Sequence, residues 1–100
     1  MKKLFISQPM KGKSDEEILA NRDEAIRQAK LNLETEEVEV IDSFFQHAPA
    51  DARPLWFLGK SLELLSTADV AYFAKGWEEA RGCRIEKICA HEYGIPVIEE

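Results

Sequence analysis

Short, mostly apolar runs recur along the chain and alternate with longer segments of mixed polarity. Apolar runs without regular polar interruption are typical of parallel strands that are covered on both faces. Such runs occur at residues 4–6, 38–41, 70–73 and 96–98. We therefore predict four short, buried strands.

The segments between these runs have apolar residues at three- and four-residue spacing, which predicts helices. Ser14 to Glu17 matches a capping box, and about five turns of amphipathic helix follow it. Pro54 suits the first turn of a second helix. The buried stripe of this second helix is expected to consist of Leu55, Leu58, Leu62 and Leu65. A third helix is predicted over 82–93, because Gly94 is typical of a helix end.

The predicted order of elements is β-α-β-α-β-α-β, which is typical of an α/β protein with a parallel sheet between two layers of helices. Because crossovers between parallel strands are right-handed, such a chain forms a small three-layer sandwich. We expect a four-stranded sheet in the order 2-1-3-4 with about three helices. No internal repeat and no low-complexity linker interrupts residues 1–100, so the sequence predicts a single domain.

Composition and charge narrow the partners that this domain is expected to have. The net charge is −6 and the hydrophobic fraction is 45%, so neither a nucleic-acid polymer nor a membrane is expected as the main partner. Cys83 and Cys89 point in different directions on one predicted helix, and no metal-binding spacing of Cys or His is present. We therefore expect no disulfide, no metal and no cofactor. The apolar run near the N-terminus is too short for a signal peptide, and the expected location is cytoplasmic.

Ligands of doubly wound sheets bind at the carboxyl ends of the strands, where the strand order reverses. Here that point lies between the first and third strands, so the loops at 7–13 and 74–81 are expected to face each other, with 42–53 beside them. The loop from Ser7 to Lys13 has a hydroxyl group and a glycine and precedes a helix, which suits a sugar or phosphate oxygen. The same residues also suit a plain strand-to-helix turn, and they lack the spacing of a dinucleotide-binding or P-loop motif.

The second candidate segment opens the last predicted helix and ends at Glu86. This glutamate follows Gly82 by four residues and lies near a helix N-terminus, whose dipole favours an ionised carboxylate that is available as a nucleophile. Helical geometry places Glu86 about 100° from Ile85, toward the helix edge, while Ile85, Ile88 and Cys89 face the sheet. An ordinary surface glutamate in the first part of a helix is the alternative.

Four motifs occur in order along the chain: Ile6-Ser7-Gln8-Pro9-Met10 followed by Gly12, then Ala68-Asp69-Val70, then Gly76-Trp77 followed by Arg81 to Glu86, and finally Ala90 with Gly94 to Val97. Together they resemble the nucleoside 2-deoxyribosyltransferase superfamily, and in particular its short, often phage-associated branch of uncharacterised proteins. The likeness covers nearly the whole chain and keeps the order of the motifs. It implies a flavodoxin-like fold and one domain of this type over residues 1–100.

The resemblance implies cleavage or transfer at the N-glycosidic bond of 2-deoxyribonucleosides or their monophosphates, by a transferase or a hydrolase. Glu86 would be the nucleophile that attacks the anomeric carbon and forms a glycosyl-enzyme intermediate. Gly82 would allow close approach of the substrate. The other candidate substrate-binding residues are Ser7, Gln8, Pro9, Met10, Gly12, Asp42, Gly76 and Trp77. Trp77 is either a stacking platform for the ligand or a lid over the core.

Two positions depart from the pattern of that family. Ala80 stands where the family usually has Asp or Ser to hold the sugar hydroxyl or phosphate, and Ser61 stands where it often has Asp. General acid–base assistance contributes roughly 10²–10⁴-fold, so a missing proton donor for the leaving base would slow the reaction. Asp42 or Asp69 would compensate, although Asp69 precedes its strand and is expected at the opposite end of the sheet. The alternatives are a binding module that keeps a nucleotide pocket without turnover, and a protein that uses only the fold.

A chain of 100 residues buries a modest core, so a homodimer or higher homo-oligomer is expected to add stability. Trp56 and Phe57 on the second predicted helix either form a dimer surface or complete the core. The expected partner besides a second copy is a small-molecule nucleoside or nucleotide.

Overall fold

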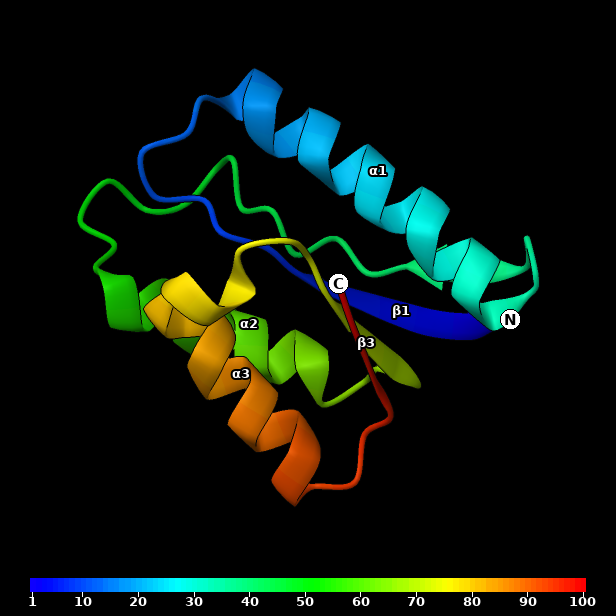
Figure 1. Ribbon diagram of the computed structural model, residues 1–100. Coiled ribbons are helices and arrows are strands. Elements are labelled where there is room, and N and C mark those ends of the chain that lie inside the picture. The colour runs from blue at the N-terminus through cyan, green and yellow to red at the C-terminus, as the bar shows by residue number, and fades with distance from the viewer.

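The strands and helices follow one another along the chain in the order that the hydrophobic pattern predicts. The computed structural model describes residues 1–100 (Figure 1). The strands are β1 (Lys2–Ser7), β2 (Val38–Val40), β3 (Val70–Phe73) and β4 (Val97–Glu99). The helices are α1 (Asp15–Leu33), α2 (Pro54–Leu65) and α3 (Arg81–Glu92), and a short 3₁₀ helix, η1 (Trp77–Glu79), lies within the segment 74–81.

All four strands are parallel and lie in the order β2-β1-β3-β4, which confirms the predicted α/β fold and strand order. Ser7 at the end of β1 pairs with Phe73 at the end of β3. The strand order reverses between these two strands, since β2 lies on the other side of β1. Their carboxyl ends therefore lie side by side at the edge where a doubly wound sheet binds its ligands.

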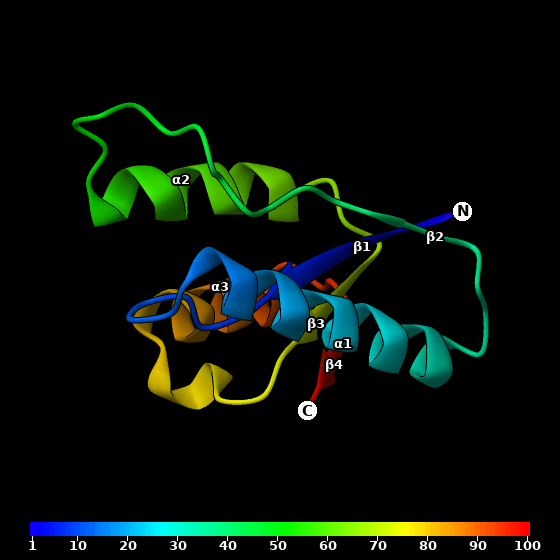
Figure 2. The same cartoon turned by 90° about the horizontal axis from the view of Figure 1, so that it is seen from above.

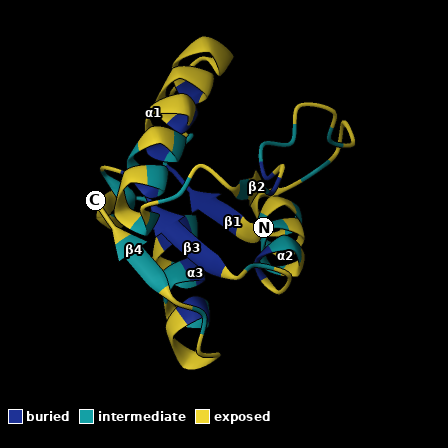
Figure 3. Cartoon of the chain, turned by 90° about the vertical axis from the view of Figure 1, so that its right-hand side faces the viewer, coloured by how far each residue is buried: buried dark blue, intermediate teal, exposed yellow.

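One helix covers one face of the sheet and two helices cover the other (Figures 1 and 3). On the α1 face, apolar side chains of β1 and β3 cluster with Ala25 and Ala29. On the opposite face, Phe5 and Phe73 cluster with residues of α2 and α3, among them Ala90. Figure 3 shows β1 and β3 as the buried centre of the molecule, as expected for strands that consist of uninterrupted apolar runs.

The helix ends follow local sequence signals. Ser14 Oγ accepts a hydrogen bond from the backbone N–H of Glu17, and the Glu17 carboxylate accepts one from the backbone N–H of Ser14, which completes the predicted capping box. Gly94 follows α3 with φ +73, a left-handed conformation that glycine adopts without strain. None of the helices combines the length and the apolar composition that crossing a lipid bilayer requires.

Two predicted helix faces are correct only in part: Leu62 and Leu65 of α2 and Cys89 of α3 pack against the core as expected. Leu55, at the start of α2, is 78% exposed, and Leu65 is the residue of that helix that the core buries fully. In α3, Ile88 is 61% exposed although its hydrophobicity predicts contact with the sheet. The buried face of α3 consists of Cys83, Glu86 and Ala90. Their spacing of three and four residues forms one stripe along the helix, so Glu86 points inward rather than toward the helix edge.

Candidate functional site

An open cleft of about 1340 Å³ lies at the edge of the sheet where β1 and β3 end. Its walls come from the loop after β1, from residues 43–45, from the start of α2, and from the segment between β3 and the first turns of α3. Figure 2 shows these segments together at one end of the molecule. Loops that are far apart in the sequence thus form one concave surface at the carboxyl edge of the sheet.

Glu86 lies in this cleft and is only 7% exposed. The hydroxyl of Ser7, itself 2% exposed, donates a hydrogen bond of 2.5 Å to Glu86 Oε1. The two residues are 79 positions apart, and the fold joins them because the end of β1 lies beside the second turn of α3. A short bond from a buried hydroxyl fixes the position of the carboxyl group. Glu86 is therefore not an ordinary surface glutamate.

Burial raises the pKa of the Glu86 carboxyl above its usual value, and the hydroxyl groups of Ser7 and Ser61 oppose this shift through hydrogen bonding. The loss of solvent outweighs these favourable contacts in the net shift of the Glu86 pKa. Ser61 belongs to α2. At the position where the resembled family often has Asp, this chain thus still presents a polar group to Glu86.

Cys83 lies one turn before Glu86 on the same buried face of α3 and also lines the cleft. Burial raises the pKa of its thiol to about 11; the Ser7 hydroxyl lowers this pKa, and the neighbouring Glu86 raises it. The thiol is therefore protonated at neutral pH, and the thiolate is the form that reacts as a nucleophile. On this face of α3, Glu86 is the stronger candidate for a nucleophile.

Gln8 lies beside Ser7, lines the cleft and is 5% exposed. Its Nε2 donates a hydrogen bond of 3.0 Å to the carbonyl oxygen of Ile18 in α1, which fixes the orientation of the amide because that carbonyl only accepts. Gln8 Oε1 is then a buried acceptor with no partner in the protein. Such groups are rare in folded proteins and call for an explanation at each site where they occur.

The two loops that follow β1 and β3 meet at Pro9 and Gly76. Gly76 has φ +88, a conformation that residues with a side chain adopt only with strain. A Cβ atom at this position would lie 3.5 Å from Pro9 Cγ. A side chain at 76 would therefore meet Pro9 in ordinary contact, and it is the left-handed turn directly after β3 that favours glycine here.

Most of the predicted site residues line the cleft, and three do not. Those that line it are Ser7, Gln8, Pro9, Met10, Gly76, Gly82 and Glu86. Gly12 forms a turn outside the cleft with φ +80, and Asp42 is exposed outside it. Trp77 packs on Phe73 of the core with 5.7 Å between the ring centroids, and it does not line the cleft. Of the two alternatives for Trp77, the lid over the core is the one that this contact supports.

Sequence reasoning missed two kinds of side chain in the cleft. The first is an aromatic wall, Phe45 and Phe57, whose ring centroids lie 6.4 Å apart and 5.9 and 5.1 Å, respectively, from that of Trp56. The aromatic residues of the aperiodic segment 42–53 are the sequence signal that points to it. The second is a set of basic side chains: Lys11, Lys13, Lys75, Arg81 and Arg84. They lie on three separate segments, so no local pattern in the sequence reveals them as a group.

A buried arginine holds the segment that carries Phe45. Arg22 of α1 donates hydrogen bonds to the carbonyl oxygen of Ile41 at 2.5 Å and to Ser43 Oγ at 3.2 Å. Ser43 Oγ donates in turn to the carbonyl oxygen of Ile6 at 3.2 Å. These bonds connect α1, β1 and the loop after β2, and they keep this wall of the cleft in place.

The cleft thus offers one buried carboxyl group with hydroxyl partners, an aromatic wall and a basic rim. No group of three or more His, Cys, Asp or Glu side chains in the chain is placed so as to hold a metal ion. Comparison with known proteins gives no match, since no family model, no curated protein and no solved structure matches this chain.

Proposed function

We propose that this protein cleaves or transfers the N-glycosidic bond of 2-deoxyribonucleosides or their monophosphates, with Glu86 as the nucleophile. The observation that carries this proposal is the buried carboxyl group of Glu86, which Ser7 holds in a cleft at the edge where the strand order reverses. The resemblance of the sequence motifs to the nucleoside 2-deoxyribosyltransferase superfamily supports the same assignment.

The proposed reaction has two displacement steps. In the first, an oxygen of the ionised Glu86 carboxylate bonds to the anomeric carbon, while the bond from that carbon to the base nitrogen breaks and its electron pair leaves with the base. A proton delivered to the base completes its departure. In the second step, water or another base attacks the same carbon and gives up a proton to solvent, while the bond from that carbon to Glu86 breaks and its electron pair returns to the carboxylate, so the configuration is retained. Water as acceptor gives hydrolysis, and a second base gives transfer.

Ser7 has two roles in this scheme. Its hydrogen bond to Glu86 Oε1 limits rotation of the carboxyl group and so orients the nucleophile. The same bond favours the charged form of Glu86, against the effect of burial. Because the charged form is the nucleophile, the rate is expected to rise with pH through the raised pKa of Glu86 and to level off above it.

The departing base needs a proton, and the two aspartates considered for this role lie elsewhere. Asp42 is exposed outside the cleft. Asp69 Oδ2 accepts a hydrogen bond of 2.7 Å from the backbone N–H of Lys3, at the opposite end of the sheet, as its position before β3 predicts. Glu79 is the other carboxyl group that lines the cleft. Because Glu79 is exposed to solvent, water that enters the open cleft is the proton donor that this proposal retains.

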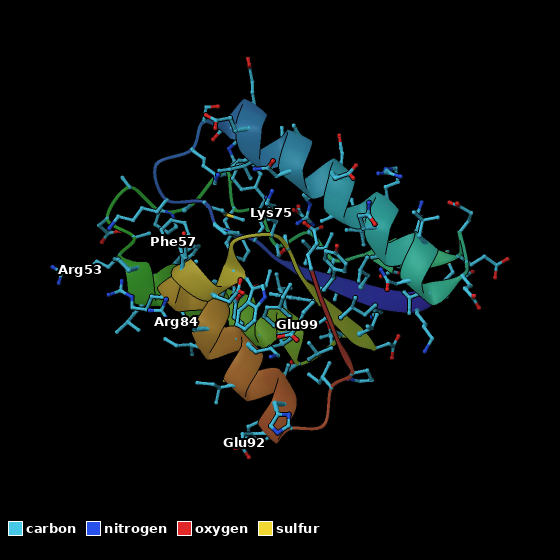
Figure 4. The ribbon with its side chains drawn as sticks, viewed as in Figure 1. Arg53, Phe57, Lys75, Arg84, Glu92 and Glu99 are labelled. Carbon is cyan, nitrogen blue, oxygen red and sulfur yellow. The ribbon has the colours of Figure 1, made fainter.

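Release of free base tests the proposal. The protein is incubated with deoxynucleosides and with deoxynucleoside monophosphates, and free base is measured by chromatography. We expect release by the wild-type protein and no release by Glu86→Gln. The matched control is Glu92→Gln, at the far end of α3 (Figure 4), where the side chain is exposed and a normal rate is expected. Equal rates for Glu86→Gln and the wild type would exclude Glu86 as the nucleophile.

A binding module without turnover is the second candidate, and two observations favour it. Ala80 provides no polar side chain at the start of α3, and burial of Glu86 disfavours its ionised form. In this case deoxynucleotides would raise the melting temperature of the wild type and of Glu86→Gln alike, with no free base from either. Base release by the wild-type protein would exclude this second candidate.

A further inference from the structure

The cleft is basic although the chain as a whole is acidic. The sequence has 19 Asp and Glu residues against 13 Lys and Arg residues. Two carboxyl groups line the cleft, Glu79 and the buried Glu86. The basic side chains that line it are all exposed: Lys11, Lys13, Lys75, Arg81 and Arg84. Positive charge is thus concentrated in the same concave region that holds the candidate nucleophile.

None of these five cations has a carboxylate partner. The ion pairs of the protein are Arg27–Glu24, Lys30–Glu36, Lys60–Glu63 and Lys87–Glu99, and none of their basic members lines the cleft. Arg84 donates a hydrogen bond of 2.9 Å, but to the carbonyl oxygen of Glu78. In a chain with more acidic than basic side chains, unpaired cations gathered in one cleft repel one another, and an anion from outside would relieve that repulsion.

The basic side chains reach the cleft from three directions. Lys11 and Lys13 lie on the loop after β1, Lys75 follows β3, and Arg81 and Arg84 lie in the first turn of α3. Figure 4 labels Arg84 at the start of α3 and Lys75 on the segment that leaves β3. The positive charge is therefore spread along the cleft, which suits a ligand with several anionic groups rather than one.

Backbone groups of two helices add to this positive field. α3 begins without a side-chain cap and without an acidic residue in its first turn, and α2 begins in the same way. Free N–H groups and the positive end of the helix dipole favour an anion at such a terminus. An independent observation is Gln8 Oε1, a buried acceptor without a protein partner on a side chain that lines the cleft.

One phosphate monoester neutralises only part of the positive charge of this site and fills only part of its volume. A monoester carries about −1.5 to −2 charges at pH 7, whereas the five cations face one exposed carboxylate, Glu79, and one buried carboxyl group. The cleft volume of about 1340 Å³ also exceeds the roughly 300–1,000 Å³ that is typical of pockets for one small molecule. Phe45 and Phe57 line the same cleft and offer aromatic surface on which a base can stack.

We propose that the cleft binds nucleotides that carry two or more phosphates, with the phosphate chain along the five basic side chains and the base against Phe45 and Phe57. The placement of the sugar at Glu86 rests on the proposed function, whereas the charge argument does not. A nucleic-acid strand fits less well, because it continues beyond the cleft over a protein whose net charge is −6. The phosphate chain takes no part in either displacement step.

Isothermal titration calorimetry with Glu86→Gln tests this proposal while the ligand stays intact. The titrants are the deoxynucleosides of the four DNA bases and their mono-, di- and triphosphates, in magnesium-free buffer at a low and a high salt concentration. For at least one base, we expect the diphosphate to bind about tenfold or more tightly than the monophosphate, a difference of about 1.4 kcal/mol. This advantage should shrink as the salt concentration rises.

Variants that each lack one positive charge show whether the preference for diphosphates comes from the basic side chains of the cleft or from non-specific electrostatic attraction to the protein. Lys13→Gln and Arg81→Gln, each combined with Glu86→Gln, should weaken diphosphate binding about fivefold or more and leave deoxynucleoside binding unchanged. Lys60→Gln is the matched control, because Lys60 is an exposed lysine of α2 that does not line the cleft. This control should leave both affinities unchanged.

Equal affinity for mono- and diphosphates, or no binding of any nucleotide, would overturn the proposal. Tighter binding of a single-stranded oligodeoxynucleotide than of the diphosphate would also overturn it, as would equally tight binding of inorganic pyrophosphate. Failure of the wild-type protein to release base from every nucleotide would refute only the proposed function. The two failures are distinguishable, since the affinities are measured with a variant that lacks the nucleophile.

Discussion

The N-termini of α1 and α3 lie at the same edge of the sheet, yet their sequences differ in kind. Ser14 caps α1, and three acidic residues follow in its first turn, so side chains of the protein itself satisfy its free N–H groups and its dipole. α3 has no side-chain cap and no acidic residue in its first turn. It begins instead with Arg81 and carries Arg84 three residues later.

The capped N-terminus of α1 therefore stabilises the fold, whereas the N-terminus of α3 has free N–H groups and faces the cleft. The second end is also followed by Glu86, a carboxyl group whose burial is unfavourable for its charged form. Features that lower stability without a compensating contact are typical of functional sites. Substitutions at the α1 terminus are therefore expected to change stability, and substitutions around α3 to change activity.

The largest effect is expected for Glu86→Gln. This substitution keeps the size of the side chain and removes the nucleophile, so the rate of base release should fall by about 10⁴-fold or more. The melting temperature at pH 7 should be unchanged or higher, because a buried ionisable group is replaced by a neutral one. Chromatography of free base and calorimetry measure the two quantities. If Glu86→Gln lost the fold as well as the activity, this part of α3 would be needed for stability, and the contrast with the N-terminus of α1 would not hold.

Ser7→Ala is expected to have the second largest effect. It removes the hydrogen bond to Glu86 Oε1, so kcat should fall by about 10- to 100-fold as the carboxyl group loses its fixed orientation. The bond also favours the charged form, so the pH at which the rate reaches half of its plateau should move upward. Ser61→Ala should shift this pH in the same direction by less. An unchanged pH–rate profile for Ser7→Ala would mean that Ser7 serves only to fill space.

The stability of Glu86→Gln relative to the wild type should depend on pH. The folded pKa of Glu86 is raised above its usual value of 4.5, so the unfolded chain ionises first as the pH increases. The wild type therefore loses stability between pH 4.5 and the folded pKa, and the Gln variant does not. Melting temperatures measured across this range should converge at the acidic end and separate, with the variant higher, at the alkaline end. A difference independent of pH would contradict the raised pKa.

Ser14→Ala should produce a smaller effect, confined to stability. Loss of the N-cap of α1 should lower the free energy of unfolding by about 1 kcal/mol and leave the rate of base release unchanged. Urea denaturation measures this change. The converse substitution, Ala80→Ser, places a capping hydroxyl at the N-cap of α3 and should stabilise the protein. A large loss of activity in Ser14→Ala would show that the two helix ends are not separate in function.

The smallest effect is expected for Ile88→Gln. Ile88 is 61% exposed, so the free energy of unfolding should change by no more than about 0.5 kcal/mol. Ala90→Leu, on the fully buried face of the same helix, should instead destabilise by about 1–3 kcal/mol through overpacking. Urea denaturation of both variants distinguishes the two faces. A larger loss for Ile88→Gln than for Ala90→Leu would mean that α3 buries the face that its hydrophobicity predicts.

The fold is predictable from the sequence because its signals act over a few residues. The capping box at Ser14 and the glycine at Gly94 mark helix ends by local hydrogen bonding and backbone conformation. The uninterrupted run Val70–Phe73 marks a buried strand. Once the order of elements is known, right-handed crossovers leave few topologies, and the strand order 2-1-3-4 is among them.

The candidate site is predictable only in part, because its contacts are long-range. The position of Glu86 near a helix start is visible in the sequence, but its hydrogen bond is to Ser7, 79 residues away. The hydrophobicity of Ile88 even points to the wrong face of α3. The basic rim assembles from three segments that are far apart in the sequence. No property of a single segment determines any of these arrangements.

Capture of the covalent intermediate tests the role of Glu86 most directly. The protein is mixed with a deoxynucleotide, quenched with acid within one turnover and digested, and the peptides are analysed by mass spectrometry. The proposed mechanism predicts a deoxyribosyl ester on the peptide that contains Glu86, and none in the Glu86→Gln variant. Release of base with the sugar attached to a different residue of the cleft, such as Glu79, would contradict it.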